Sequence, residues 1–165
     1  ELKRKLPDTV TLTVIPTTEK YLIVNDKGYI CVDEHGKVLS LKKMKLQEGS
    51  YRIKGFEPQT AVAGEEYVPS DSNKEKFKLV KQMIAAMEDG GVIKSAVIDL
   101  EDMNDIQVLY NGNVMIYFGE CKDMENRIDL AEGVIKDAIT NSQSGYIDLR
   151  YDGRAFFNEG TTRID

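Results

Sequence analysis

Two alternating runs on either side of Asn111-Gly112 constrain the fold of this chain more than any other feature. Residues 106–110 and 114–118 each carry a β-branched or aromatic side chain at every second position. Alternation of this kind is typical of half-buried strands. Asn-Gly favours a tight turn between them, because both turn positions need a positive φ. The chain is therefore predicted to contain an antiparallel hairpin and to fold around a β-sheet.

The first third of the chain also reads as strands. Residues 9–14 alternate strictly, and residues 21–24, 29–32 and 38–41 are short apolar runs separated by polar turns at 25–28 and 33–36. Consecutive strands joined by short turns predict an antiparallel meander. Residues 42–71 are weakly patterned, with one short strand expected at 51–53. The region 92–100 reads as a further strand.

Two amphipathic helices interrupt the strands. Ser72 and Glu75 have the spacing of a capping box at the start of the first helix, and Gly90-Gly91 ends it. The second helix is expected over residues 122–140, with apolar residues three or four positions apart. Strands at 146–151 and 154–157 around Asp152-Gly153 predict a final hairpin. No internal repeat is evident. These elements predict an α+β fold: an antiparallel sheet with two amphipathic helices packed on one face.

Composition limits the functions that the chain can have. With 165 residues it has the length of one domain, and 41% hydrophobic residues are enough for a core. The net charge of −6 disfavours a nucleic-acid partner, which would require a basic surface. Cys31 and Cys121 lie in or beside apolar stretches, so we interpret them as buried free thiols rather than as a disulfide framework.

Residues suited to catalysis or metal binding are few. The single histidine, His35, lies in a polar turn, and there is no cysteine pair at zinc spacing and no phosphate-binding or nucleophile-elbow motif. The densest acidic cluster is interpreted as a solvated loop rather than a cation site, and the basic residues of the 42–45 stretch as a solvated strand end. No cofactor or metal is expected. The acidic cluster comprises Asp99, Glu101, Asp102 and Asp105; the basic residues are Lys42, Lys43 and Lys45.

Aromatic residues gather in the final hairpin instead. Tyr146, Tyr151, Phe156 and Phe157 lie within twelve positions. A terminal hairpin is a candidate sheet edge, whose unpaired N–H and C=O groups are available to another chain. An apolar edge without proline can accept a partner strand. The absence of catalytic motifs and this edge together favour a binding module.

Two stretches of the chain resemble the FtsQ/DivIB family of bacterial cell-division proteins. The first covers residues 6–14 and 28–38, and ends in the pattern Asp-x-x-Gly-x-Val from Asp33 to Val38. The second covers residues 106–119, the helix at 124–139 and residues 145–153, where Gly-Tyr-Ile-Asp-Leu-Arg-Tyr-Asp-Gly looks like the C-terminal signature of the family. The order and spacing extend over nearly the whole chain. One departure is Pro16-Thr17-Thr18-Glu19, which replaces the Glu-Arg that usually follows the first strand.

The resemblance implies a domain organisation and a location. Residues 1–18 would be the last strand of a truncated POTRA domain, residues 19–158 the partner-binding β domain, and residues 159–165 a flexible tail. The whole protein would cross the cell membrane once through an N-terminal helix that is absent here. This domain would then lie on the extracytoplasmic side at the division septum.

The resemblance also implies a function, that of a non-enzymatic divisome scaffold. Its partners would be FtsB/DivIC-like and FtsL-like proteins, one of which would add a strand to the C-terminal edge strand. Arg150 and Tyr151 match the Arg-Tyr of the family's interface, and Ala155, Phe156 and Phe157 match its final edge strand; Tyr146 is grouped with them as a partner-binding residue.

Two other classes of function stay open at the level of sequence. One is a cell-wall hydrolase that uses the acidic cluster, which would require two carboxylates facing one cleft. The other is a generic ligand-sensing module, which would require a deep apolar pocket.

Overall fold

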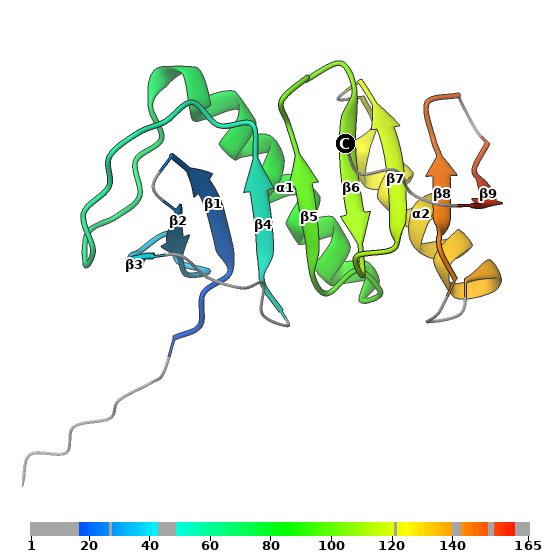
Figure 1. Cartoon of the computed structure of the whole chain (residues 1–165), viewed down its shortest axis with the longest axis horizontal. Helices are drawn as coiled ribbons and strands as arrows, with labels where there is room; N and C mark the ends of the chain where they lie inside the picture. Colours follow the sequence, from blue (N-terminus) through cyan, green and yellow to red (C-terminus); the bar gives the residue numbers. More distant parts are fainter. Residues whose placement is uncertain are drawn as a thin grey trace, which may run out of the picture.

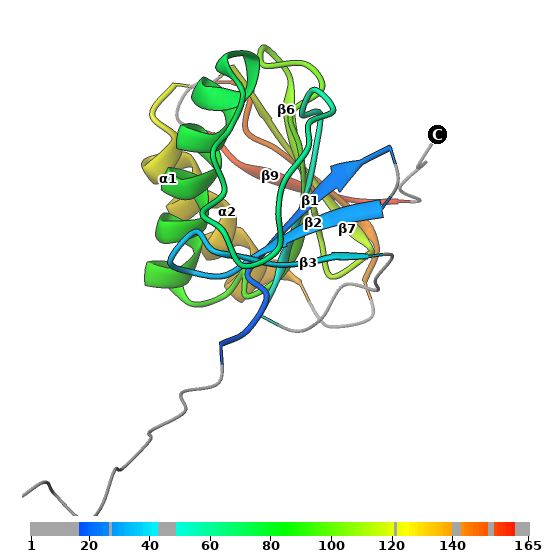
Figure 2. The same ribbon diagram turned by 90° about the vertical axis from the view of Figure 1, so that its left-hand side faces the viewer.

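A computed structural model describes residues 17–26, 28–42, 49–120, 122–139, 143–151 and 154–160. Within these residues nine strands form one sheet in the order β3-β2-β1-β4-β5-β6-β7-β8-β9. Both α-helices lie on the same side of the sheet, which we call its helix face, and leave the opposite side, the open face, without a helix (Figures 1 and 2). The strand predicted at 9–14, Cys121, the Asp152-Gly153 turn and most of the predicted tail lie outside the described residues.

The elements follow the predicted order along the chain. The first four strands precede a short 3-10 helix and α1, and the last five strands are interrupted by α2. The bounds are β1 Tyr21–Asn25, β2 Gly28–Val32, β3 Val38–Lys42, β4 Tyr51–Lys54, η1 Asp71–Asn73, α1 Lys74–Gly90, β5 Ala96–Asp99, β6 Ile106–Tyr110, β7 Val114–Gly119, α2 Met124–Ala138, β8 Gly145–Asp148 and β9 Phe156–Glu159.

The predicted α+β class is confirmed, but the sheet is mixed rather than antiparallel throughout. Of the pairings between described strands, β1–β4, β4–β5 and β7–β8 are parallel, and the other five are antiparallel. The helices account for two of the three parallel pairs: α1 joins β4 to β5 and α2 joins β7 to β8, and a helical crossover returns the chain in the direction in which it left. Alternation of side chains does not report strand direction, so the sequence pattern could not reveal this.

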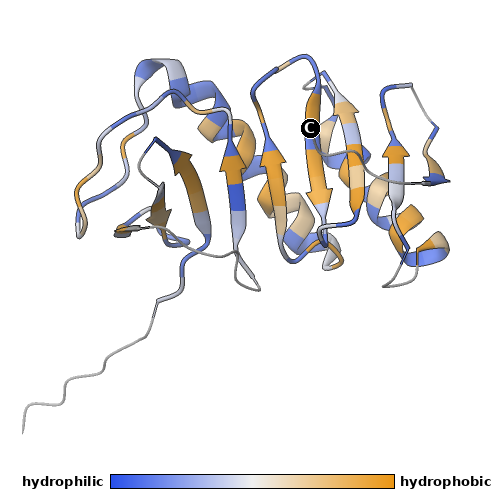
Figure 3. Cartoon of the chain, viewed as in Figure 1, coloured by the Kyte–Doolittle hydropathy of each residue, from blue (hydrophilic) through white to orange (hydrophobic). Residues whose placement is uncertain are grey.

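The core lies between the helix face and the two helices. Alternate residues of the central strands are buried there, as the hydrophobic bands of Figure 3 illustrate. The predicted stripe of α2 is confirmed at Met124, Ile128, Ala131 and Ile135, whereas Ala138 is exposed. From α1 the buried residues are Leu79, Val80, Met83, Ile84 and Met87.

The predicted capping box at the start of α1 is wrong. The helix begins at Lys74, and its N-cap residue Asn73 makes no side-chain capping hydrogen bond. The buried Asn73 amide is used elsewhere: its Oδ1 accepts the Glu57 N–H at 2.8 Å, and its Nδ2 donates to the Glu57 carbonyl at 2.9 Å. The predicted end is confirmed, because Gly91 adopts the left-handed conformation (φ 75°) and its N–H donates to the Met87 carbonyl.

The chain contains a tandem structural repeat. The first repeat unit consists of β4, α1, β5 and β6, and the second repeat unit consists of β7, α2, β8 and β9. In each unit the helix joins two adjacent parallel strands and a third strand returns antiparallel to the second. The two units stand side by side in the sheet, joined by the antiparallel pair β6–β7 (Figure 1). The expectation that the chain has no internal repeat was therefore wrong.

The registers of the two units coincide. Ala96 pairs with Tyr110 as Gly145 pairs with Glu159, so corresponding residues of β5–β6 and β8–β9 are separated by 49 positions throughout. Only Ile-Asp-Leu is identical at matched positions of these two segments, at 98–100 and 147–149.

The shared Asp makes the same turn in both units. Asp99 Oδ1 accepts the Glu101 N–H at 3.0 Å, and Asp148 Oδ1 accepts the Arg150 N–H at 3.1 Å. An aspartate that bonds a backbone N–H two residues further on forms an Asx turn. The shared Asp of Ile-Asp-Leu therefore has a structural role in both units. Three identical residues were too few to reveal the repeat from the sequence alone.

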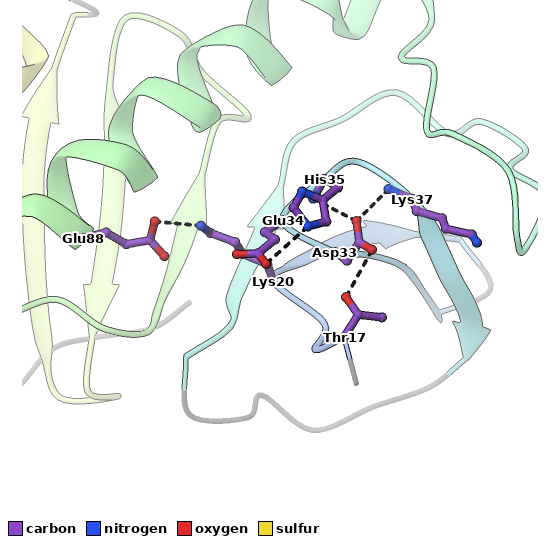
Figure 4. Close-up of polar contacts among 7 residues, drawn as sticks. All are labelled: Thr17, Lys20, Asp33, Glu34, His35, Lys37 and Glu88. Carbon is purple, nitrogen blue, oxygen red and sulfur yellow. Dashed lines mark hydrogen bonds and ion pairs between the residues drawn. The ribbon is translucent and has the colours of Figure 1, made fainter. Parts of the chain in front are cut away.

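Side chains fix the segment that enters β1. Figure 4 shows the buried Asp33 carboxylate between the β2–β3 turn and Thr17. Its Oδ1 accepts the N–H groups of His35 (2.9 Å) and Lys37 (2.8 Å), and its Oδ2 accepts the Thr17 hydroxyl at 3.2 Å. Burial alone would raise the pKa of Asp33, but these three hydrogen bonds outweigh it and the pKa is lowered. Lys20 pairs with Glu88 of α1 at 2.7 Å, so the entering segment is tied to both the sheet and a helix.

Candidate partner-binding edge

Strand β9 lies at one end of the sheet, with β8 as its neighbour. The Gly160 N–H donates to the Ser144 carbonyl at 3.1 Å, which makes these two residues a hydrogen-bonded pair. Hydrogen-bonded and non-hydrogen-bonded pairs alternate along an antiparallel ladder. In the β8–β9 register, Phe156 and Asn158 therefore direct their backbone groups toward β8, and Phe157 and Glu159 direct theirs away from the sheet.

Gly145 allows β9 to lie close to β8. A Cβ atom at this position would lie 2.3 Å from the Asn158 carbonyl oxygen and 2.7 Å from Cε2 of the Phe157 ring. The Phe157 ring therefore covers the backbone of Gly145 on the helix face, where any larger residue would clash. The absence of a side chain at this one position sets how closely the edge strand packs.

A groove runs between α2 and β9. Its wall on the helix includes Leu130, which is 43% exposed, together with Gly133 and Val134. Ala155, Phe156 and Phe157 line the other side, and Asp129 and Asp137 are among its polar residues. The groove is thus mainly apolar and lies directly beside the outward-facing backbone of β9.

On the open face, an arginine and two tyrosines form a second feature of the same edge. Arg150 donates from Nε to Asp148 Oδ1 at 2.9 Å and from Nη2 to Asp148 Oδ2 at 2.6 Å, a two-point pairing. Its guanidinium carbon lies 5.0 Å from the centroid of the Tyr117 ring, a cation–π distance. The Tyr117 and Tyr146 rings meet edge to face at 5.9 Å. The hydrogen bond from Arg150 lowers the pKa of Asp148, so this carboxylate is ionised at neutral pH.

The structure brings the six predicted partner-binding residues to one end of the sheet. Tyr146 lies on the open face of β8, and Arg150 follows β8. Tyr151 is 70% exposed and Phe156 is 57% exposed. Phe157 and Ala155 are half-buried on the side of α2. Nothing in the structure brings a partner to these residues, and their binding role stays a prediction.

Sequence reasoning missed several residues of this edge. Tyr117 and Asp148 were not considered, nor were Leu130, Gly133 and Val134 of α2. The helix residues lie off the buried stripe, so helical periodicity assigned them to solvent. The Ile-Asp-Leu identity at a spacing of 49 was the signal that could have directed attention to Asp148, because it marks the same turn in both units.

The other candidate residues are dispersed. His35 is exposed, with 80% of its side-chain surface accessible, and Cys31 is buried, as predicted. Asp99 lies 3.9 Å from Lys54, and Glu101 lines a hollow that also contains Lys54 and Lys76. Among the described residues, no group of three or more histidine, cysteine or acidic side chains is arranged to hold a metal ion.

A family model described as "Cell division protein FtsQ/DivIB, C-terminal" matches residues 21–150, from β1 to the Arg150 that follows β8. The chain belongs to this family, and it is a cell-division protein. Two relatives share similarity along almost its whole length. It is 27% identical over 160 residues to "Cell division protein DivIB" of Clostridium tetani, and 21% identical over 157 residues to "Cell division protein DivIB" of Clostridium acetobutylicum.

The alignments cover more of this chain than of the relatives. They include 93% of the chain and 58% of the C. tetani protein, and 95% of the chain and 61% of the C. acetobutylicum protein. The chain thus spans about three fifths of the length of these relatives. Within the residues that the structure describes, neither helix has the length and apolar character needed to cross a membrane.

Proposed function

We propose that this chain is a non-enzymatic scaffold domain of the divisome, which binds a division protein of the FtsB/DivIC or FtsL type by accepting one of its strands at β9. The observation that carries the proposal is the free edge of β9. Among the described residues no other segment pairs with its outer side, where the N–H and C=O groups of Phe157 and Glu159 point. An added strand would gain main-chain hydrogen bonds there.

The repeat supports an antiparallel orientation for the added strand. In the first repeat unit, β6 occupies the position that β9 occupies in the second, and the neighbour of β6 is β7, which runs antiparallel to it. The outer side of β9 is thus the position where another β7-like strand would stand. A partner strand that enters antiparallel would repeat a pairing that the sheet already contains.

The groove beside β9 supplies the specificity that backbone pairing lacks. Alternate side chains of an added strand would point to the helix face, where Leu130, Val134 and Phe157 line the groove. We expect apolar residues at these positions of the partner. The other side chains of the strand would point to the open face, where Phe156 of β9 would lie beside them and Tyr146 of β8 would lie one strand further in.

The family membership supports the setting of this proposal. The relatives are named as cell-division proteins, and a septal location next to the membrane with this domain outside the cytoplasm accords with the family. Residues 1–18 would then be the last strand of a POTRA domain, and the contacts of Thr17 and Lys20 would fix the junction to the β domain at the sheet.

The test removes an outward backbone donor without removing a bond to β8. Glu159 is exposed and its N–H points away from β8, so Glu159→Pro should leave the sheet intact while removing one donor to the partner. We expect affinity for the extracytoplasmic segment of the DivIC-type protein of the same organism to fall about tenfold, as measured by titration calorimetry.

Glu159→Ala is the matched control, because it removes the same side chain and keeps the donor. It should bind like the unchanged protein. Equal binding by the proline and alanine variants would contradict pairing at this position. A partner segment that does not bind the unchanged protein at all would refute the proposed function.

A further inference from the structure

The two repeat units have the same strand pairing, but the side chains at and around the position of Arg150 differ between them. At matched positions the first unit has Glu101 where the second has Arg150, and Lys54 where the second has Tyr117. The first unit therefore has the same Asx turn, at Asp99, but no arginine to pair with it. Both units therefore have the aspartate that forms the turn, and only the second unit has an arginine paired with it.

Three contacts define where the guanidinium lies. Asp148 accepts two of its N–H groups, as described above, and the Tyr117 ring supports its face. Gly119 leaves room for the stem of the arginine: a Cβ atom there would lie 3.0 Å from Arg150 Cγ. A side chain with this many supports loses little freedom on binding, since its rotamer is already selected.

The guanidinium keeps N–H donors that these contacts do not engage. It has five N–H donors, of which Asp148 takes two, and 44% of the Arg150 side-chain surface is exposed. It also lies on the open face, over β7 and β8, and Arg150 immediately precedes the exposed Tyr151. An oxygen acceptor on a segment that leaves the β9 edge across the open face can reach it.

We propose that Tyr117 and Asp148 are positioning residues, which hold the Arg150 guanidinium flat against the open face so that its remaining N–H donors meet oxygen acceptors of the bound partner. This inference rests on the proposed function, and it names residues outside the edge strand on which affinity depends. Asp148 acts through the two-point pairing and Tyr117 through the ring face. Neither residue needs to touch the partner.

The repeat provides matched variants for the test. Asp148→Asn keeps an oxygen for the Asx turn and removes the charge that pairs with Arg150, and Asp99→Asn makes the same change in the first unit. Tyr117→Leu removes the ring face, and Tyr117→Phe keeps it. Arg150→Ala gives the loss expected when the guanidinium itself is absent.

We expect Asp148→Asn and Tyr117→Leu each to weaken binding of the DivIC-type extracytoplasmic segment about threefold to tenfold in titration calorimetry. Asp99→Asn and Tyr117→Phe should bind like the unchanged protein. In nitrogen-15 NMR spectra of the free protein, the Arg150 Nε–H signal should exchange with water faster in Asp148→Asn, and unchanged exchange would refute the positioning role without any partner.

The two proposals fail in different ways. If the unchanged protein does not bind the segment, the proposed function is refuted, and the positioning proposal falls with it. If the unchanged protein binds, Arg150→Ala weakens binding and Asp148→Asn does not, only the positioning role is refuted. Equal losses from Asp99→Asn and Asp148→Asn would show a general effect of the turn, which also overturns the proposal.

Discussion

The two repeat units share one backbone arrangement and differ in what surrounds their last strand. In the first unit β6 is covered by β7, whereas in the second unit no described segment covers β9. Side chains at matched positions differ accordingly. Where the first unit has Lys54, Val97 and Gln107, the second has Tyr117, Tyr146 and Phe156. The second unit thus has aromatic residues at these positions of β7, β8 and β9, where the first has none, and this difference agrees with the proposed binding role of the edge.

The opposite edge of the sheet supports this interpretation. Strand β3 is also an edge strand, but a later loop pairs with its beginning. The Val38 N–H donates to the Glu65 carbonyl and the Val38 carbonyl accepts the Gly64 N–H, both at 2.8 Å. Lys37 forms an isolated bridge with Glu66. Covering an edge in this way is a common protection against unwanted pairing, and β9 lacks such cover among the described residues.

The largest expected effect comes from making the two units alike at Gly145, whose counterpart is Ala96. Gly145→Ala places a Cβ atom against the Asn158 carbonyl, so β9 must shift away from β8. We expect a loss of about 1–3 kcal/mol in urea unfolding. Hydrogen exchange should show lost protection of the Asn158 and Gly160 amides. Protection equal to that of the unchanged protein would show that β9 tolerates the methyl group.

A second change tests a difference between the helices. Glu132 of α2 is buried, and its Oε1 accepts the N–H groups of Val92 (3.2 Å) and Ile93 (3.0 Å). The buried residues of the two helices have the same spacing, and in this alignment the residue of α1 that matches Glu132 is Ile84. Glu132→Ile should cost about 2 kcal/mol in urea unfolding, because the buried Ile93 amide and the half-buried Val92 amide lose their acceptor. Glu125→Ile on the exposed side of α2 is the control, and a similar loss in both variants would argue against this explanation.

Tyr151→Ala examines the edge through binding alone. The side chain is 70% exposed, so its removal should change the free energy of unfolding by less than about 0.5 kcal/mol. Affinity for the DivIC-type segment should fall about tenfold, since aromatic residues at the centre of an interface contribute much of its binding energy. Calorimetric titration and urea unfolding of the same sample separate the two effects. Unchanged affinity would contradict a contact at Tyr151.

The smallest expected effect concerns acid stability. The Arg150 pairing lowers the pKa of Asp148 in the folded chain, so the stabilisation is present above the pKa of the unfolded carboxyl, about 3.8, and is lost as the pH falls through the lower folded value. Arg150→Ala should therefore reduce stability at pH 7 by less than about 1 kcal/mol, because the guanidinium is partly exposed. The difference should shrink as the pH falls below about 3.8. A difference that persists undiminished at pH 2 would exclude the ion pair as its source.

The sequence predicted those parts of the fold that depend on local geometry. The turn at Asn111-Gly112 is confirmed, with φ values of 52° and 76°, because positive φ is a property of these two residues themselves. The capping box failed because Ser72 lies in the 3-10 turn Asp71–Asn73 and α1 begins only at Lys74, which makes Asn73 the N-cap residue. Strand direction and the repeat were missed for a similar reason: they depend on how segments pair, and few residues are identical at matched positions of the two units.

The candidate edge was predicted only in part, because some of its features are local in sequence and others depend on how distant segments pack together. Aromatic residues of the last hairpin are visible in the sequence because they are unusual for a terminal segment. The groove was not visible, since Leu130 and Val134 become its wall only when β9 lies beside α2. Asp148 and Tyr117 became candidates only when the register placed them next to Arg150.

The repeat also affects how this chain folds when many copies are present. Strands β6 and β9 offer similar ladders, so the β7 strand of one molecule can pair with the β9 strand of another before its own hairpin closes. Exchange of equivalent segments is a characteristic error of repetitive proteins. The three-residue turn of Asn111, Gly112 and Asn113 limits this error because it brings β7 back to β6 in a time on the order of microseconds, long before two molecules meet at micromolar concentration. Lengthening that turn should therefore favour intertwined dimers during refolding at high concentration.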